Sequence, residues 1–334
     1  MIKLKKMNNL LEVKELSVQF ITPTGILYTL DKVSFEIKPK EIVGLVGESG
    51  CGKSVTALSI LRLLPEYNSR ITSGKIIFMG KDLLKLSEKE LRQIRGKEIS
   101  MIFQEPASAL NPVYPVGKQI RDLLRLHFGI SRKEAKSKAI QLMTTVGISD
   151  AEKRYYSYPH ELSGGMCQRI LIAMAIASNP KLLIADEPTT ALDVTVQAQI
   201  MDLLASLKTD FDMSILFITH DLSLLAEYGD RIVVMYAGQV IEIGKIQEIL
   251  SSPLHPYTEA LLKAIPRGDK RKKEIKAIPG SVPQLFSSLP KGCRFSNRCE
   301  KAFELCFLKE PKLIEIDKDR KVKCHLYQNQ SYMS

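Results

Sequence analysis

The run GESGCGKS at 47–54 has the glycine spacing and the closing Lys-Ser pair of a phosphate-binding loop. Its glycines allow the backbone to wrap closely around an anion and to point several N–H groups inward. Lys53 is suited to contact the β- and γ-phosphates of a nucleotide, and Ser54 to ligate Mg²⁺. The predicted nucleotide-binding residues are Gly47, Glu48, Ser49, Gly50, Cys51, Gly52, Lys53, Ser54 and Val55.

Two acidic residues follow a continuous apolar run further along the chain. KLLIAD at 181–186 is typical of a buried strand that ends in Asp186, and Glu187 comes next. Asp186 can hold Mg²⁺ through water, and Glu187 can orient or deprotonate an attacking water. His220 follows another apolar run and would reach the same edge of a parallel sheet, where it could donate to the γ-phosphate. A helix cap or a solvated loop would explain the acidic pair alone, but not beside a phosphate loop.

A second glycine pair lies in LSGGMCQR at 162–169, more than a hundred residues after the loop. Ser163, Gly164 and Gly165 would present hydroxyl and amide donors at the start of a helix, where anions bind. A simple helix cap explains the serine but not the two glycines after it. The sequence therefore predicts a second anion-binding segment. The loop at 47–54 already suffices for one nucleotide, so this second segment needs another explanation.

The elements that must position these residues alternate between strand and helix. Period-two apolar residues indicate half-buried strands at 16–20 and 33–37. Further strands are expected at 41–46, 75–79, 99–103, 181–186, 214–219 and 231–236, with a hairpin at 237–239. Helices are expected at 53–64 and through most of 116–178. This alternation predicts an α/β domain with a largely parallel sheet.

Composition limits the class of protein. The chain has 334 residues, of which 45% are hydrophobic, and no run of eighteen uncharged apolar residues occurs, so we expect no membrane span. The N-terminus lacks the pattern of a secretory signal, and we expect a cytosolic protein whose six cysteines are not disulfide-bonded. The net charge of +11 could indicate a polyanion partner. Because the basic residues are scattered, we interpret them as a solvated surface and expect no nucleic-acid partner.

The character of the chain changes after about residue 252. Prolines recur there, and the segment predicts a small appended domain with little regular structure. Its cysteine spacing, C-x₅-C-x₆-C-x₁₇-C, contains no C-x-x-C pair and supports a zinc ribbon only weakly. Four thiolates could instead hold an iron–sulfur cluster, or four reduced thiols could simply pack. The residues are Cys293, Cys299, Cys306 and Cys324.

Taken in order, these motifs resemble those of the nucleotide-binding domain of ATP-binding cassette (ABC) ATPases. The matches are Walker A at 47–54, the Q-loop at Gln104, the signature at 162–166, Walker B at Asp186-Glu187, the D-loop at Asp193 and the switch histidine at His220. The resemblance covers roughly residues 12–250. It implies a RecA-like α/β core, an antiparallel β subdomain and a helical subdomain at about 105–178, within a nucleotide-binding domain at 1–251.

The resemblance also implies roles for single residues. In this family the signature contacts the ATP bound by a second domain, so the active state would be an obligate dimer with Asp193 at its seam. The signature residues are Leu162, Ser163, Gly164, Gly165 and Met166. Tyr28 lies where the family stacks an aromatic on adenine, although a packing tyrosine is the alternative. The implied catalytic residues are Lys53, Gln104, Glu187 and His220, and the implied Mg²⁺ ligands are Ser54, Gln104 and Asp186.

Longer runs narrow the resemblance. FQEPASALNPVYPVG, YPHELSGGMCQR, ADEPTTALDVTVQAQI and SSPLHPYTEALL resemble the ATPase subunits of bacterial oligopeptide and dipeptide importers, specifically the first of their two ATPase types. This implies ATP and Mg²⁺ as ligands and a peripheral location on the cytoplasmic face of the membrane. The implied partners are a second, different ATPase subunit, two transmembrane permeases and a substrate-binding protein. A nickel or metal-chelate importer and, more distantly, a non-transport nucleic-acid ATPase are the alternatives.

The same resemblance extends to the end of the chain. The His-Pro-Tyr run at 255–257 introduces the family's C-terminal extension, here 252–334. CRFSNRCEKAFELC, followed by KVKCH, implies a [4Fe–4S] cluster on the four cysteines and makes zinc the less favoured metal.

Overall fold

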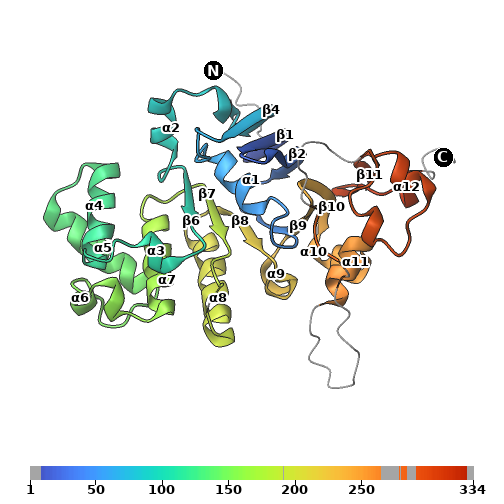
Figure 1. Cartoon of the computed structure of the whole chain (residues 1–334). Coiled ribbons are helices and arrows are strands. Elements are labelled where there is room, and N and C mark those ends of the chain that lie inside the picture. The colour runs from blue at the N-terminus through green and yellow to red at the C-terminus, as the bar shows by residue number, and fades with distance from the viewer. Residues whose placement is uncertain (1–8, 191, 265–277, 279, 284–290, 329–334) are drawn as a thin grey trace, which may run out of the picture. The chain divides into compact units, whose positions relative to one another are not determined.

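The structure is a computed structural model that describes residues 9–190, 192–264, 278, 280–283 and 291–328 (Figure 1). The first eight residues, part of the segment searched for a secretory signal, lie outside these ranges. The chain divides into two compact units. One comprises Met1–Lys85 and Thr219–Ser334, and the other comprises Leu86–Ile218.

An antiparallel sheet with the order β2-β1-β4-β5 belongs to the first unit. Its strands are β1 (Leu11–Thr22), β2 (Gly25–Ile37), β4 (Ser69–Phe78) and β5 (Lys81–Asp82). Leu16 and Val18 on β1 and Val33 on β2 are fully buried, whereas Ser17 between the first two is partly exposed. The period-two pattern therefore predicted both strands and the face that each one buries.

The strands that carry the phosphate loop form a separate sheet region of the same unit. Its strands are β3 (Ile42–Val46), β9 (Arg231–Tyr236) and β10 (Gln239–Lys245), and its helices are α1 (Lys53–Ile60), α9 (Leu222–Tyr228) and α10 (Ile246–Ser251). β3 pairs with β9 in parallel, and β9 forms an antiparallel hairpin with β10, as predicted. Every residue of β3 is buried, which agrees with its continuous apolar sequence.

The C-terminal extension contains more regular structure than the sequence predicted. Its elements are α11 (Pro256–Lys263), the 3₁₀ helix η3 (Ser296–Arg298), α12 (Glu304–Leu308), β11 (Ile314–Asp317), β12 (Arg320–Val322) and α13 (His325–Gln328). β12 pairs with β10, with Glu242 opposite Val322, and β11 pairs with β12. The expectation of little regular structure is corrected here. These strands have only four and three residues, which is too short for a pattern to stand out, and β10 supplies the hydrogen-bonding partner of β12.

The second unit contains three parallel strands, with helices after the first two of them. The strands are β6 (Ile99–Ile102), β7 (Leu182–Asp186) and β8 (Ser214–Thr219), with β7 between the other two. The helices are α2 (Glu88–Ile94), α3 (Pro106–Ala109), α4 (Val116–Phe128), α5 (Arg132–Thr145), α6 (Ala151–Arg154), η2 (Pro159–Glu161), α7 (Gly164–Ile176) and α8 (Val194–Asp210). α4 to α7 lie in the segment 116–178 that was predicted to be helical, whereas α3 precedes it.

One predicted helix is shorter in the structure. The pattern predicted a helix over 53–64, but α1 ends at Ile60. Arg62 has a φ of 51°, which breaks the helix, and Pro65 disfavours helical backbone at the residue before it. Among the residues that the structure describes, no helix is long and apolar enough to span a bilayer.

Candidate functional site

The phosphate loop lies between β3 and α1 and encloses its own lysine. Lys53 is only 5% exposed, and its ammonium donates to the carbonyl oxygens of Gly47 at 2.8 Å and Glu48 at 3.1 Å. Gly52 is the N-cap of α1, with a φ of 107° and no side-chain cap. Gly52 has no side chain to cap α1, and the N-terminus of a helix favours a bound anion.

Gly47 is required by the close approach of a neighbouring strand. A Cβ at this position would lie 2.3 Å from the carbonyl oxygen of Met235 and 2.7 Å from Sγ of Cys51. Cys51 is fully buried, and burial raises the pKa of its thiol, so it fills space as a neutral group. A glycine-lined cradle with one buried lysine fits the phosphate chain of a nucleotide.

Tyr28 lies on β2, next to a residue that approaches the loop. The carbonyl oxygen of Thr29 would be 3.1 Å from a Cβ on Gly52. The N–H of Gly238 donates to the carbonyl of Cys51 at 2.9 Å, which ties the β9–β10 turn to the same loop. Tyr28 itself is half-buried. Its stacking on adenine remains a prediction.

Asp186 ends β7 and Glu187 follows it, as the sequence predicted. Asp186 is buried, and Glu187 has a φ of 47°, a left-handed conformation that is uncommon outside glycine. The N–H of Glu187 donates to the carbonyl of Ile218 at 2.9 Å. Its Oε2 accepts hydrogen bonds from Nε2 of Gln104 and from Oγ1 of Thr190, both at 3.0 Å. The structure thus brings together two predicted catalytic residues, and it adds Thr190, which the sequence analysis missed although it lies three residues away.

The signature forms the start of α7. Ser163 is the N-cap, and its Oγ accepts from the N–H of Met166 at 3.3 Å. Both Ser163 and Gly164 are exposed. A Cβ on Gly165 would lie 2.9 Å from Cγ1 of Val196, whereas one on Gly164 would meet no heavy atom closer than 3.6 Å. Packing within the chain therefore requires the second glycine but not the first.

Two further predicted residues lie at the starts of helices. Asp193 caps α8, because its Oδ1 accepts from the N–H of Val196 at 3.0 Å. His220 is exposed and directly follows β8. The next residue, Asp221, caps α9 through the N–H of Ser223 at 2.8 Å. The dimer-seam role of Asp193 and the γ-phosphate contact of His220 remain predictions.

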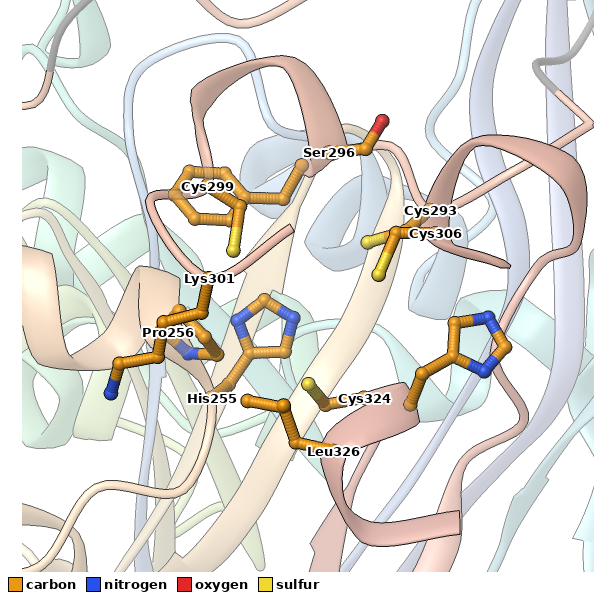
Figure 2. Close-up of a pocket in the computed structure, with 11 residues that line it drawn as sticks. His255, Pro256, Cys293, Ser296, Cys299, Lys301, Cys306, Cys324 and Leu326 are labelled. Carbon is orange, nitrogen blue, oxygen red and sulfur yellow. The ribbon is translucent and has the colours of Figure 1, made fainter. Parts of the chain in front are cut away.

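The four cysteines of the extension line one cavity (Figure 2). The N–H of Cys293 donates to the carbonyl of Cys306 at 2.7 Å, and both residues line the cavity. Burial raises the pKa of Cys293 and of Cys324 to about 11. In the described part of the chain, no group of three or more His, Cys, Asp or Glu side chains is arranged to hold a metal ion. The thiols therefore share a cavity without forming the ligand set of a single ion.

Two protein-family models match the chain. Residues 30–190 match the family described as ABC transporter, a range that includes the phosphate loop, Gln104, the signature and Glu187. Residues 241–306 match the family described as oligopeptide/dipeptide transporter, C-terminal region. Three of the four cavity cysteines, but not Cys324, lie in that second range.

Curated relatives match along nearly their whole length. A putative peptide import ATP-binding protein of Brucella abortus is 53% identical over 302 residues, which are 90% of each chain. The oligopeptide transport ATP-binding protein AppD of Bacillus subtilis is 48% identical over 97% of this chain and 98% of its own. OppD of the same organism is 48% identical over 96% of this chain and 90% of its own.

Solved structures match the cassette. A dimeric post-hydrolysis structure of the ATP-binding cassette MJ0796, bound to ADP and Pi, has a TM-score of 0.64 and 28% identity and covers 71% of this chain and 98% of that one. The structure of cbiO1 from Clostridium perfringens, part of an ABC transporter complex, has a TM-score of 0.62 and 27% identity. It covers 73% of this chain and 92% of that one.

The fold, the phosphate loop, the signature and these matches define an ABC ATPase, which confirms the predicted fold class and enzyme class. ATP and the Mg²⁺ that accompanies it are the ligands of this class. Within the class, the chain belongs to the ATP-binding proteins of the oligopeptide/dipeptide transporter family.

Proposed function

We propose that this ABC ATPase energises the uptake of dipeptides or oligopeptides across the bacterial cytoplasmic membrane. The observation that carries the proposal is the match to peptide import ATP-binding proteins over the cassette and the extension together. None of the relatives named above is described as a nickel or metal-chelate importer, so peptide is the favoured cargo.

The chain would work as one part of a complex on the cytoplasmic face of the membrane. Two transmembrane permeases would form the pathway, and a substrate-binding protein would deliver the peptide. The ATPase dimer would pair this chain with a second, different ATPase subunit. Its exposed signature, with Ser163 and Gly164 open to solvent, supports a contact to nucleotide bound by that partner.

The catalytic roles follow from the chemistry of each group. Lys53 would offset phosphate charge, Glu187 would activate the attacking water, and His220 would donate to the γ-phosphate. Mg²⁺, when bound, neutralises phosphate charge, and its ligands would be Ser54, Gln104 and Asp186. The hydrogen bond from Gln104 to Glu187 supports a shared position at the attacking water.

Reconstitution of the complete complex in lipid vesicles tests this function. We expect ATP-dependent accumulation of a labelled dipeptide or oligopeptide, and no accumulation when ATP is replaced by a non-hydrolysable analogue. Labelled nickel provides the comparison cargo. ATP-dependent accumulation of nickel without peptide would contradict the proposal.

The extension would carry a [4Fe–4S] cluster on Cys293, Cys299, Cys306 and Cys324. One cavity lined by four cysteines supports this, because a cluster with four irons holds its thiolates further apart than a single ion does. Protonated thiols with raised pKa would release protons on ligation. The cluster would then join short segments that bury little apolar surface of their own.

Metal analysis of anaerobically purified chain tests the cluster. We expect about four irons and four acid-labile sulfides per chain and little zinc. Cys306→Ser should lose the iron, whereas Cys167→Ser, a buried cysteine outside the cavity, should keep it. Stoichiometric zinc, or no metal at all, would contradict the cluster.

A further inference from the structure

One residue of the phosphate loop is held from the C-terminal extension. The carbonyl of Glu48 accepts from Lys53 at 3.1 Å, as described above. Its N–H donates to the hydroxyl of Tyr257 at 2.9 Å, and its carboxylate accepts from Nη1 of Arg298 at 3.0 Å. Tyr257 and Arg298 both lie beyond residue 252. The extension therefore contacts the main chain and the side chain of the same loop residue.

Arg298 is fixed by more than this ion pair. Its side chain is only 8% exposed, and Nη1 also donates to the hydroxyl of Tyr236 at 3.2 Å. The guanidinium lies 5.7 Å from the centroid of the same ring. The group stays charged, because a guanidinium does not lose its proton in proteins. A charged, oriented guanidinium forms a stronger hydrogen bond than a neutral donor does.

An aromatic cluster connects the two residues that hold the loop. The ring centroids of Tyr236 and Tyr257 are 4.7 Å apart, and Phe295 lies 5.2 and 5.4 Å from them. Phe295 and Arg298 both lie between Cys293 and Cys299 in the sequence. The segment that reaches the loop is therefore anchored in an aromatic cluster that includes Tyr236 of β9, and its movement is restricted.

We propose that Arg298 is a positioning residue for ATP, which keeps the phosphate loop in its binding shape by holding the carboxylate of Glu48. This inference rests on the ATPase function given above. When Lys53 shares its donors with a phosphate, its bond to Glu48 weakens, and the bonds from Arg298 and Tyr257 then hold the loop. Loss of Arg298 therefore lowers the affinity for ATP and leaves the chemical step unchanged.

The alternative is that the ion pair only fastens the extension to the cassette. A second ion pair distinguishes a positioning role from a fastening role. Lys38 and Asp319 also join the cassette to the extension, at 3.1 Å, but they do not contact the loop. Asp319→Asn is the matched control, since it removes one charge of that pair and suits the positive φ of 66° at this position. A fastening role predicts the same effect from both variants.

Steady-state ATP hydrolysis by the assembled complex, together with binding of a fluorescent ATP analogue, tests the proposal. We expect Arg298→Ala to raise KM for ATP and the dissociation constant about tenfold, with kcat within about twofold of wild type. Arg298→Lys should restore most of the affinity, and Asp319→Asn should leave it unchanged. If Arg298→Ala does not fold, Glu48→Gln removes the same charge pair from the other side and should raise KM similarly.

Three results would overturn the proposal: an unchanged KM in both Arg298→Ala and Glu48→Gln, a loss confined to kcat, or an equal rise in KM in Asp319→Asn. The wild-type complex separates this inference from the function on which it rests. If wild type hydrolyses ATP and imports peptide while these variants retain its KM, only the role of Arg298 is excluded. If wild type does neither, the proposed function itself fails.

Discussion

Nε2 of Gln104 and Oε2 of Glu187 lie 3.0 Å apart, and the hydroxyl of Thr190 donates to that same oxygen. Glu187 also adopts a left-handed backbone conformation. A strained backbone and two side-chain donors from separate segments thus fix one carboxylate after β7. Such preorganisation is what a group that acts on a water molecule needs.

Replacement of Glu187 by glutamine should separate binding from hydrolysis. The amide has the size of the carboxylate and can still accept hydrogen bonds from Gln104 and Thr190, but it cannot take a proton. We expect phosphate release by the assembled complex to fall at least about 100-fold, with affinity for labelled ATP within about twofold of wild type. Thr190→Val, which removes one donor, should cost about tenfold in rate. Wild-type hydrolysis by the glutamine variant would exclude Glu187 from this role.

Gly164→Ala provides a test of the contact with a partner's nucleotide. Because the new methyl group would meet nothing closer than 3.6 Å within the chain, folding should be unaffected. In a closed dimer the methyl group would face the partner's phosphate, so ATP hydrolysis by the complex should fall at least about tenfold. Thermal unfolding of the chain and phosphate release by the complex are the measurements.

Gly165→Ala is the comparison for that variant. Its methyl group would lie 2.9 Å from Val196, so we expect a loss of about 1–3 kcal/mol in the free energy of unfolding. Full hydrolysis by a stable Gly164→Ala complex would show that the exposed glycine does not contact nucleotide.

Glu242→Ala should strongly destabilise the junction between cassette and extension. Glu242 is fully buried, and its two oxygens accept the N–H groups of Leu254 at 2.8 Å and His255 at 2.9 Å. Arg320 lies 3.7 Å away. Because the alanine leaves these partners buried without an acceptor, we expect a loss of about 3–5 kcal/mol, measured by denaturant unfolding of the purified chain.

The control for Glu242 is Glu248→Ala on the neighbouring helix. Glu248 forms a more exposed ion pair with Lys245 at 3.5 Å, and its removal should change stability by less than about 1 kcal/mol. Equal effects from both variants would mean that the buried carboxylate is not the anchor.

His255 should make the free energy of unfolding depend on pH. Burial lowers the pKa of its imidazole from the usual 6.5 to about 3, and Nδ1 accepts the N–H of Tyr257 at 3.0 Å. Between these two values only the unfolded chain binds the proton. The free energy of unfolding should therefore decrease as the pH falls from 6.5 towards 3, with a contribution of about 1.4 kcal/mol per pH unit.

His255→Asn should remove this contribution, because asparagine does not titrate there and its oxygen can still cap α11. The measurement is denaturant unfolding of both proteins across that pH range. Identical slopes for the wild type and the variant would contradict a neutral, buried His255.

The sequence predicted the parts of the fold that carry strong local signals. β3, β7, β8 and β9 are continuous apolar runs, and β1 and β2 alternate, so the local pattern of apolar residues is enough to locate them. β12 was not predicted because its three residues, Arg320 to Val322, are too few to show a pattern and form a strand by pairing with β10 and β11. The end of α1 was overestimated because the left-handed turn at Arg62 leaves no mark in apolar periodicity.

The site divides in the same way. The loop at 47–54 and the signature at 162–166 are each one unbroken stretch of sequence, so each can be predicted without knowledge of tertiary contacts. Contacts such as that between Arg298 and Glu48 join residues 250 positions apart and depend on tertiary packing. The sequence therefore predicted candidate nucleotide contacts, but it did not predict the tertiary contacts that hold those residues in place.

The pairing of β12 with β10 makes the extension more than a detachable tail. A chain cut after residue 251 would expose the main-chain donors and acceptors of β10 that β12 now occupies, and it would leave Glu242 without its partners. Truncated chains would therefore tend to associate through the exposed edges of their β10 strands. For the same reason, exchanging tails between relatives would require the matching β10 to be transplanted with them.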